Sequence, residues 1–358
     1  MDRPQLFLDE LLWARSSHRM IKEGMSEKNE LVVVAGADGF IGGSLVADLR
    51  RQGYSRIRGV GAKPFEHWCQ HFPDVENIQL DLKERQNCET AVRDALQIFM
   101  LAANHGGLGF TESHKAECML SVLISTHMLM AARKHGAQKY FYASSATVYN
   151  ASKRRDINCA GLKEEDAYPA EPQDGYGWEK LFSERMCRHF REDYGLRTRV
   201  ARYHNVYGPH GAWVGGRENA PAAICRKVIE AKVKCHTEIP IWGDGKQTRS
   251  FVYIDDCLKG TQMIMNSEIL EPINLGSAET ATIDQLIDIV ESIAGAKFKR
   301  VYDLSAATGV NGRSSDNTLI RKMLNWEPSI SLQEGLEKTY RWIYDQYMAR
   351  EKGSPVLA

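Results

Sequence analysis

An apolar run that passes directly into closely spaced glycines places the strongest constraint on how this chain folds. Leu31-Val32-Val33-Val34 has the composition of a buried parallel strand. It continues into Ala35-Gly36-Ala37-Asp38-Gly39-Phe40-Ile41-Gly42-Gly43 and then into a helical pattern that reaches Arg51. Glycines between a strand and a helix let the backbone approach a pyrophosphate, whose charge the helix N-terminus stabilises. We therefore predict a dinucleotide site formed by Gly36, Gly39, Phe40, Ile41 and Gly42.

Strand-like and helical segments alternate as far as about residue 203, which predicts an α/β fold with a right-handed, doubly wound parallel sheet. Beyond Tyr203 the chain changes to loops rich in glycine and proline, such as Tyr207-Gly208-Pro209. We expect an N-terminal extension over 1–29, a dinucleotide-binding Rossmann domain over 30–203, and a smaller C-terminal substrate-binding domain over 204–358. Part of 251–276 is expected to return to the Rossmann domain.

The choice of dinucleotide depends on the second strand, which we expect near 56–60. Such a strand ordinarily ends in an acid that holds the adenosine ribose hydroxyls, but here the chain reads Gly59-Val60-Gly61-Ala62-Lys63. We expect NAD; NADP stays possible, because Lys63 could face a 2′-phosphate. After the third strand, Asp81 and Leu82 are expected at the adenine edge. The fourth strand is expected over Ile98–Ala103, followed by a turn beside the nicotinamide.

A tyrosine and a lysine four residues apart, Tyr176 and Lys180, follow an apolar run that ends in the hydroxyl residues Ser144 and Ser145. On a helix the two side chains share one face, and we expect the lysine ammonium to lower the pKa of the phenol. The Ser145 hydroxyl at the end of a strand can hydrogen-bond the same substrate oxygen. Downstream of a dinucleotide site, this trio predicts removal of a proton from a sugar hydroxyl while a nicotinamide takes the hydride. Tyr-x-x-x-Lys alone is common by chance.

Composition excludes several other classes of function. Lys+Arg and Asp+Glu both number 46, so no net field points to nucleic acid or a membrane surface. No apolar run approaches the roughly 18 residues of a membrane span. The eight cysteines form no Cys-x-x-Cys pair, so we expect reduced thiols, no metal and a cytoplasmic protein.

Several longer motifs accompany the trio and resemble one branch of the extended short-chain dehydrogenase/reductase superfamily, the GDP-mannose 3,5-epimerases. The likeness covers roughly residues 30–345. It is carried by Gly106-Gly107-Leu108-Gly109-Phe110, Glu171-Pro172-Gln173-Asp174-Gly175-Tyr176-Gly177, His204-Asn205-Val206-Tyr207-Gly208-Pro209, Gly215-Gly216-Arg217-Glu218, Trp242-Gly243-Asp244-Gly245-Lys246-Gln247-Thr248-Arg249-Ser250-Phe251 and Gly312-Arg313-Ser314-Ser315-Asp316-Asn317.

The resemblance implies a GDP-sugar substrate and a homodimer. The residues that it assigns to substrate binding, besides Ser145, are Gly106, Gly107, Asn205, Glu218, Asn219, Lys227, Gln247, Arg249 and Arg313.

Two positions depart from that branch. Its members use a cysteine and a lysine as the acid/base pair for carbons 3 and 5, and here those positions are Thr147 and Asn219. Neither a threonine hydroxyl nor an asparagine amide titrates near neutral pH. Ser145-Ala146-Thr147-Val148-Tyr149 is similar instead to UDP-galactose 4-epimerases, which need only the redox trio. The leading hypothesis from sequence is therefore 4-epimerisation of a GDP-hexose through a transient 4-keto sugar, with Ser145, Tyr176, Lys180 and Thr147 as the catalytic set. Tyr176 and Lys180 are also expected to bind the cofactor, with Lys180 holding its ribose.

Three alternatives stay open at this point. A 3,5-epimerase could use other residues, such as His105 or a water held by Thr147. A net 4-oxidoreductase of a GDP-sugar would exchange its cofactor. A sensor that binds a dinucleotide without catalysis would have no need to keep Tyr176 and Lys180 together.

Overall fold

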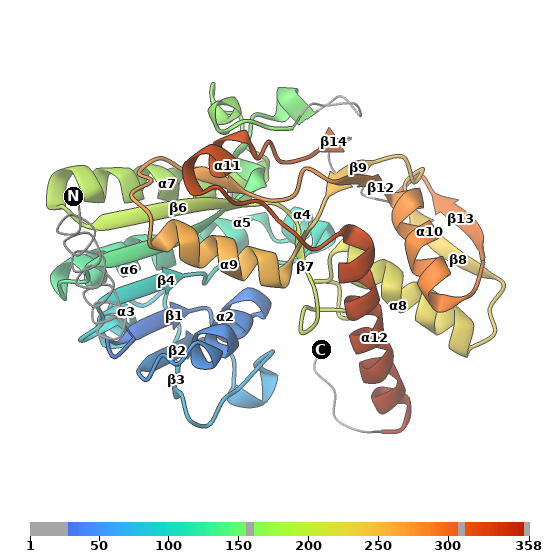
Figure 1. Cartoon of the computed structure of the whole chain (residues 1–358), viewed down its shortest axis with the longest axis horizontal. Helices are drawn as coiled ribbons and strands as arrows, with labels where there is room; N and C mark the ends of the chain where they lie inside the picture. Colours follow the sequence, from blue (N-terminus) through green and yellow to red (C-terminus); the bar gives the residue numbers. More distant parts are fainter. Residues whose placement is uncertain (1–27, 155–160, 307–311, 354–358) are drawn as a thin grey trace, which may run out of the picture.

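The computed structural model describes residues 28–154, 161–306 and 312–353, and a parallel seven-stranded sheet forms its centre (Figure 1). The strands lie in the order β3-β2-β1-β4-β5-β6-β11, so the expected doubly wound α/β fold is confirmed. Their bounds are Val32–Ala35 for β1, Ile57–Gly61 for β2, Glu76–Gln79 for β3, Gln97–Met100 for β4, Lys139–Ser145 for β5, Arg197–Tyr203 for β6 and Ile273–Leu275 for β11.

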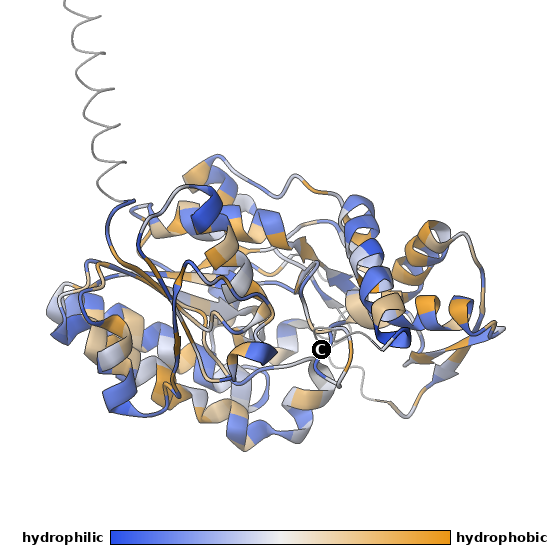
Figure 2. Cartoon of the chain, turned by 90° about the horizontal axis from the view of Figure 1, so that it is seen from below, coloured by the Kyte–Doolittle hydropathy of each residue, from blue (hydrophilic) through white to orange (hydrophobic). Residues whose placement is uncertain are grey.

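Helices cover both faces of this sheet, because β1 is apolar on both of its sides. Val32 and Val34 belong to one buried cluster with Leu45 of α2 (Phe40–Arg51), whereas Val33 and Ala35 belong to a second with residues of α6 (Ser121–Lys134). The helix α9 (Ile254–Met265) lies beside α2, and α3 (Arg85–Val92) and α7 (Asp174–Tyr194) lie beside α6. Figure 2 shows mainly hydrophobic strands between helices that carry both hydrophobic and hydrophilic residues.

Most of the chain beyond β6 forms a second group of elements, on the right of Figure 1. There α8 packs against α10 and α12, and the parallel pair β8 and β13 lies outside them. The bounds are Val206–Tyr207 for β7, Ala220–Val233 for α8, Glu238–Trp242 for β8, Thr248–Ser250 for β9, Val252–Tyr253 for β10, Thr280–Thr282 for β12, Ile283–Ala294 for α10, Lys299–Asp303 for β13, Gly312–Arg313 for β14 and Leu332–Glu351 for α12. The helix α11 (Thr318–Leu324) lies instead beside β11 of the central sheet.

Two strand boundaries differ from the sequence prediction. The second strand lies one residue later than expected, and β4 ends at Met100 rather than at Ala103. Leu101 still donates a hydrogen bond to the Ala35 carbonyl, and Ala102 then lies against Gly36 of the glycine loop. Most of the expected N-terminal extension, residues 1–27, lies outside the described residues.

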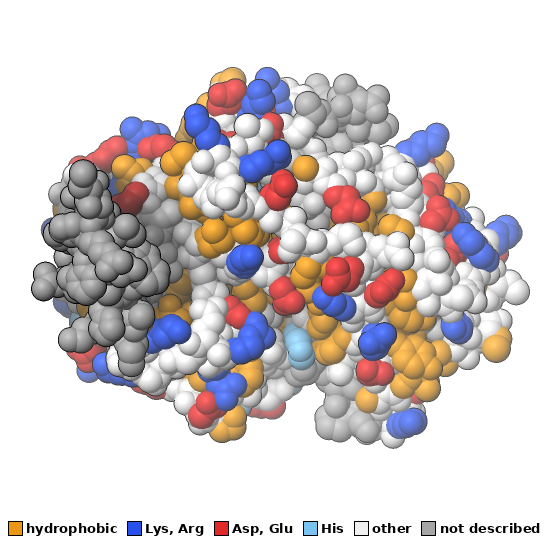
Figure 3. All heavy atoms as spheres, viewed as in Figure 1, with side chains coloured by type: hydrophobic (Ala, Val, Ile, Leu, Met, Phe, Trp, Pro, Cys, Tyr) orange, Lys and Arg blue, Asp and Glu red, His pale blue; other side chains and the backbone are white. Residues whose placement is uncertain are grey.

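Charged side chains of both signs are mixed over the face seen in Figure 3. This agrees with the equal numbers of acidic and basic residues. The face in view therefore has no continuous positively charged surface of the kind that binds a polyanion. Among the described residues, no helix is both long and apolar enough to cross a membrane.

Candidate active site

The loop between β1 and α2 has the shape of a dinucleotide cradle. Gly36 has a φ of +89°, and a Cβ on Gly42 would come within 2.0 Å of the Gly36 carbonyl oxygen. The glycines therefore pack backbone against backbone and leave the start of α2 uncovered. No acidic side chain stands in the first turn of this helix, so its N-terminus can stabilise a diphosphate. The predicted set from Gly36 to Gly42 thus fits NAD.

The two residues expected at the adenine edge differ in exposure, since Asp81 is exposed and Leu82 is buried. Asp81 lies after β3, where one carboxylate oxygen accepts a hydrogen bond from the Lys83 backbone and the other lies 3.4 Å from the Lys83 ammonium. The Leu82 side chain is buried in the core on the α3 side of the sheet. A contact of Leu82 with a cofactor would therefore involve its backbone.

Tyr176, Ser145 and His105 come together where β5 ends and α7 begins. Ser145 is the last residue of β5, and Tyr176 lies in the first turn of α7, which packs against that strand. The His105 ring stacks on the Tyr176 ring, with a centroid separation of 4.2 Å and an angle of 18° between the planes. Sequence alone offered no reason to prefer this histidine over one that only makes a local hydrogen bond.

Lys180 lies one turn further along α7 and is fully enclosed. Its ammonium donates a hydrogen bond to the Ala143 carbonyl, 3.0 Å away, and lies 5.5 Å from the centroid of the Tyr176 ring. The Glu179 carboxylate is also buried and lies 3.8 Å from the ammonium. One Glu179 oxygen accepts hydrogen bonds from the hydroxyls of Ser125, Tyr142 and Ser183.

The expected fall in the pKa of Tyr176 is wrong. Burial raises the pKa of Tyr176 well above its ordinary value, and the nearby charge of Glu179 acts in the same direction. A hydrogen bond with Ser145 and the positive charge of Arg313 act to lower it. Burial also lowers the pKa of Lys180, which the Glu179 carboxylate opposes. Desolvation of the phenol therefore determines the pKa of Tyr176, and the Tyr-x-x-x-Lys spacing on which the prediction rested does not report it.

Arg313 connects the second group of elements to this centre. It lies on β14, its guanidinium donates a hydrogen bond to the Asn205 side-chain oxygen at 2.8 Å, and its Nε is buried without a partner among the described residues. Arg249 is its parallel neighbour on β9. Arg313 also contributes a positive charge at both Tyr176 and His105, so it can meet a substrate that contacts the trio.

The glycine loop after β4 is joined to the segment before α8. Gly107 donates a backbone hydrogen bond to the Arg217 carbonyl, and the Arg217 guanidinium donates to the His105 carbonyl at 2.9 Å. Gly106 lies against the Arg217 side chain. The Glu218 carboxylate forms an ion pair with Arg226 and accepts a hydrogen bond from the Gly216 amide. These contacts hold the loop that carries His105 over Tyr176.

Thr147 and Asn219, the two departures from the 3,5-epimerase pattern, lie in different environments. The Thr147 hydroxyl is buried next to the trio and has no hydrogen-bond partner among the described residues. Asn219 caps α8: its side-chain oxygen accepts from the Ala222 amide, and its nitrogen donates to the Val206 carbonyl at 2.8 Å. Both ends of this amide are therefore occupied within the fold.

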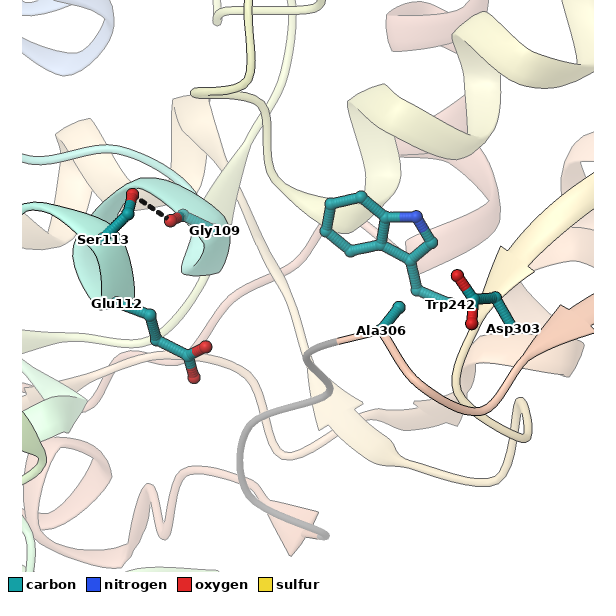
Figure 4. A pocket seen from close by; sticks show the side chains of 6 residues that line it. All are labelled: Gly109, Glu112, Ser113, Trp242, Asp303 and Ala306. Atoms are coloured by element: carbon teal, nitrogen blue, oxygen red, sulfur yellow. Dashed lines mark hydrogen bonds between the residues drawn. The ribbon is translucent and has the colours of Figure 1, made fainter.

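Lys227 and Gln247 belong to the segments on either side of β8. The Lys227 ammonium donates to the Pro240 carbonyl at 2.8 Å and lies 5.7 Å from the centroid of the Trp242 ring. Gln247 is buried before β9. Trp242, whose residue surface is 55% exposed, lines an open cavity of about 410 Å³ (Figure 4). The remaining lining residues, none of them in the predicted site, are Gly109, Glu112, Ser113, Asp303 and Ala306.

Comparison with known proteins gives a family and several relatives. The NAD dependent epimerase/dehydratase family matches residues 32–276. GDP-mannose 3,5-epimerase of Arabidopsis thaliana is 40% identical over 331 residues, which are 92% of this chain and 86% of that protein. GDP-mannose 3,5-epimerase 1 of Oryza sativa subsp. indica is 41% identical over 316 residues, 88% of this chain and 82% of that protein.

Solved structures share the fold at lower identity. UDP-glucose 4-epimerase of Thermotoga maritima, solved with UDP-glucose, superposes with a TM-score of 0.80 at 24% identity and covers 88% of this chain and 99% of its own. UDP-glucose 4-epimerase of Thermus thermophilus, solved with NAD, gives 0.74 at 21% identity and covers 87% and 98%.

Proposed function

Because the chain belongs to the NAD dependent epimerase/dehydratase family and is a nucleotide-sugar epimerase, we propose that it converts a GDP-hexose through a transient 4-keto sugar. The observation that carries the proposal is the meeting of Tyr176, Ser145 and Arg313 at the end of β5. The names of the relatives at 40% and 41% identity favour inversion at carbons 3 and 5 over inversion at carbon 4 alone. We therefore place 3,5-epimerisation ahead of the 4-epimerisation that the sequence suggested first.

The trio acts on the 4-hydroxyl. Bound NAD supplies the hydride acceptor for the oxidation and the donor for its reversal. Tyr176 takes the hydroxyl proton as general base and later returns it as general acid. Ser145, already within hydrogen-bonding reach of the phenol, orients the same oxygen. Lys180 places a positive charge behind the phenol, where it favours the tyrosinate over the neutral phenol.

His105 is our candidate for the proton transfers at the carbons next to the keto group. Desolvation, together with the positive charges of Lys180, Arg313 and Arg217, lowers the pKa of His105. The residue is nevertheless exposed to solvent, so a substrate can reach it. At neutral pH its ring is uncharged and can accept a proton from one face of the sugar. Inversion then needs a proton delivered to the opposite face, and our candidate for that donor is a water held by the Thr147 hydroxyl, which has no hydrogen-bond partner among the described residues. The stacking on Tyr176 supports this role, because it holds the ring next to the proposed base for the 4-hydroxyl.

Epimerisation at carbon 4 is the second candidate, and the residues at 147 and 219 favour it. The Thr147 hydroxyl does not titrate near neutral pH, and the Asn219 amide caps α8 through its oxygen and bonds the Val206 carbonyl through its nitrogen. If His105 does not reach carbon 3 or 5, only carbon 4 reacts. The test is incubation of the purified protein with GDP-mannose, followed by NMR of the sugar ring. Inversion at carbon 3 or 5 supports the proposal. A stoichiometric gain or loss of reduced cofactor would indicate a net oxidoreductase. No conversion of the sugar would indicate a sensor.

Replacement of the histidine tests its role separately. We expect His105→Gln to slow inversion at carbons 3 and 5 about 10–100-fold, because a bound water replaces the imidazole only poorly. Binding of GDP-mannose should change little. The matched control is His114→Gln, since His114 stacks on Phe110 of the same segment rather than on Tyr176. Equal activity of the His105 and His114 variants would remove His105 from the reaction.

An exposed apolar patch supports the expected homodimer. Met119, at the end of α5 (Lys115–Met119), and Trp178 and Phe182 of α7 are between 47% and 51% exposed. Their helices pack against each other, so a second copy could cover these side chains.

We expect Trp178→Glu with Phe182→Glu to convert a dimer into a monomer, because the carboxylates would be desolvated in a shared interface. Light scattering during gel filtration measures the mass. Met323→Glu, at an exposed position on α11, serves as control. A wild type that elutes as a monomer at all concentrations would contradict the proposal.

A further inference from the structure

The end of β2 lacks the acid that ordinarily holds the adenosine ribose, but an acid from another segment occupies its place. Asp38 belongs to the glycine loop between β1 and α2. One of its carboxylate oxygens accepts a hydrogen bond from the Lys63 backbone amide at 3.3 Å. The other oxygen has no hydrogen-bond partner among the described residues, and the residue is only half-buried. The carboxylate therefore stands at the carboxyl end of β2, open to a ligand.

Glycine at position 61 is what allows this arrangement. A Cβ on Gly61, the last residue of β2, would lie 2.4 Å from the Asp38 Cβ and 2.8 Å from its Oδ1. Any side chain at the end of β2 would therefore displace the Asp38 carboxylate, and an acid there would also repel it. The absence of an acid at position 61 and the presence of one at position 38 are thus linked by steric exclusion.

We propose that the Asp38 carboxylate replaces the missing acid of β2, accepts hydrogen bonds from the adenosine ribose hydroxyls, and selects NAD over NADP. The neighbouring α2 N-terminus fixes the diphosphate, so the ribose must lie toward the end of β2. A carboxylate there bonds the two ribose hydroxyls and repels a 2′-phosphate.

Lys63 is the competing group, since a lysine beside the ribose would attract a 2′-phosphate. Its ammonium donates a hydrogen bond to the Asp38 backbone carbonyl at 3.2 Å, so it is held beside the loop, and its residue is exposed. A solvated ammonium interacts more weakly than a half-buried carboxylate in contact with the ribose. We therefore attribute the selection of NAD over NADP to Asp38.

The test is a competition between the two dinucleotides on the full-length protein. Wild type and variants are equilibrated with equimolar NAD and NADP, and the bound ratio is measured by mass spectrometry after denaturation. We expect Asp38→Asn, which preserves the shape of the side chain, to lower the NAD:NADP ratio at least about tenfold. Glu66→Gln removes the same charge from an exposed position after β2 and should leave the ratio unchanged.

A relocation variant tests the steric argument. Asp38→Gly combined with Gly61→Asp moves the acid to the end of β2 and removes the clash, so it should restore the wild-type preference. A well-folded double variant without preference would contradict the positional argument. An unchanged NAD:NADP ratio in Asp38→Asn would overturn the inference about Asp38 but not the cofactor assignment. A preference of the wild type for NADP that Lys63→Ala abolishes would have the same consequence. A wild type that retains neither dinucleotide would overturn the cofactor assignment and the inference with it.

Discussion

Tyr176→Phe is expected to lower turnover of a GDP-hexose by about 10²–10⁴-fold while the protein keeps its dinucleotide. The phenol is the group placed to exchange a proton with the 4-hydroxyl, and Ser145 is within reach of the same oxygen. Phenylalanine preserves the ring that stacks on His105, so the loop above the site should stay in position. The measurement is the steady-state rate with GDP-mannose together with the dinucleotide content of each preparation.

Tyr344→Phe is the matched control, because this tyrosine is exposed on α12, far along the chain from the trio. It should have wild-type activity. If Tyr176→Phe is also within a few-fold of wild type, the 4-hydroxyl is not deprotonated by Tyr176 and the assignment of the trio fails.

Loss of the buried ion pair behind the site should produce the largest change in stability. The Glu184 carboxylate on α7 accepts two hydrogen bonds from the Arg202 guanidinium on β6, at 2.9 and 2.8 Å, and one from the Ser144 hydroxyl at 2.5 Å. Both charged side chains are 3% exposed. Arg202→Met leaves a carboxylate buried without its partner, so we expect the free energy of unfolding to fall by about 3–5 kcal/mol. Denaturant unfolding monitored by fluorescence measures it.

The double variant Arg202→Met with Glu184→Leu removes both charges and should recover much of that loss, because no unpaired charge remains. Arg197→Met is the control for loss of an exposed arginine, since Arg197 lies on the same strand and forms an ion pair with Glu268 near the surface. If Arg202→Met is no less stable than Arg197→Met, the buried pair does not fasten α7 to the sheet.

Much of the fold could be predicted from local patterns. The valines of β1 and the glycines that follow them determine a strand, a tight loop and a helix whose packing involves only neighbouring residues. The doubly wound parallel sheet then follows from right-handed crossovers. The position of Ser145 at the end of a strand and the shared face of Tyr176 and Lys180 also follow from local periodicity.

Features of the site that depend on segments distant in sequence could not be predicted in the same way. The stacking of His105 on Tyr176 requires Arg217, from beyond β6, to hold the loop after β4. The raised pKa of Tyr176 depends on how completely the folded chain excludes water, which spacing does not report. The approach of Asp38 to the end of β2 had one available signal, a glycine at 61 where an acid was expected.

Deuterium incorporation during turnover tests the central proposal most directly. The wild-type protein is incubated with GDP-mannose in deuterated water, and NMR and mass spectrometry locate deuterium on the sugar. A proton lost from carbon 3 or 5 exchanges with solvent, whereas inversion at carbon 4 moves hydride internally and takes up no deuterium on carbon. We predict deuterium at carbon 3 or carbon 5, at a rate that His105→Gln reduces and His114→Gln does not. A product inverted at carbon 4 with no deuterium on any carbon would contradict 3,5-epimerisation and establish the 4-epimerase instead.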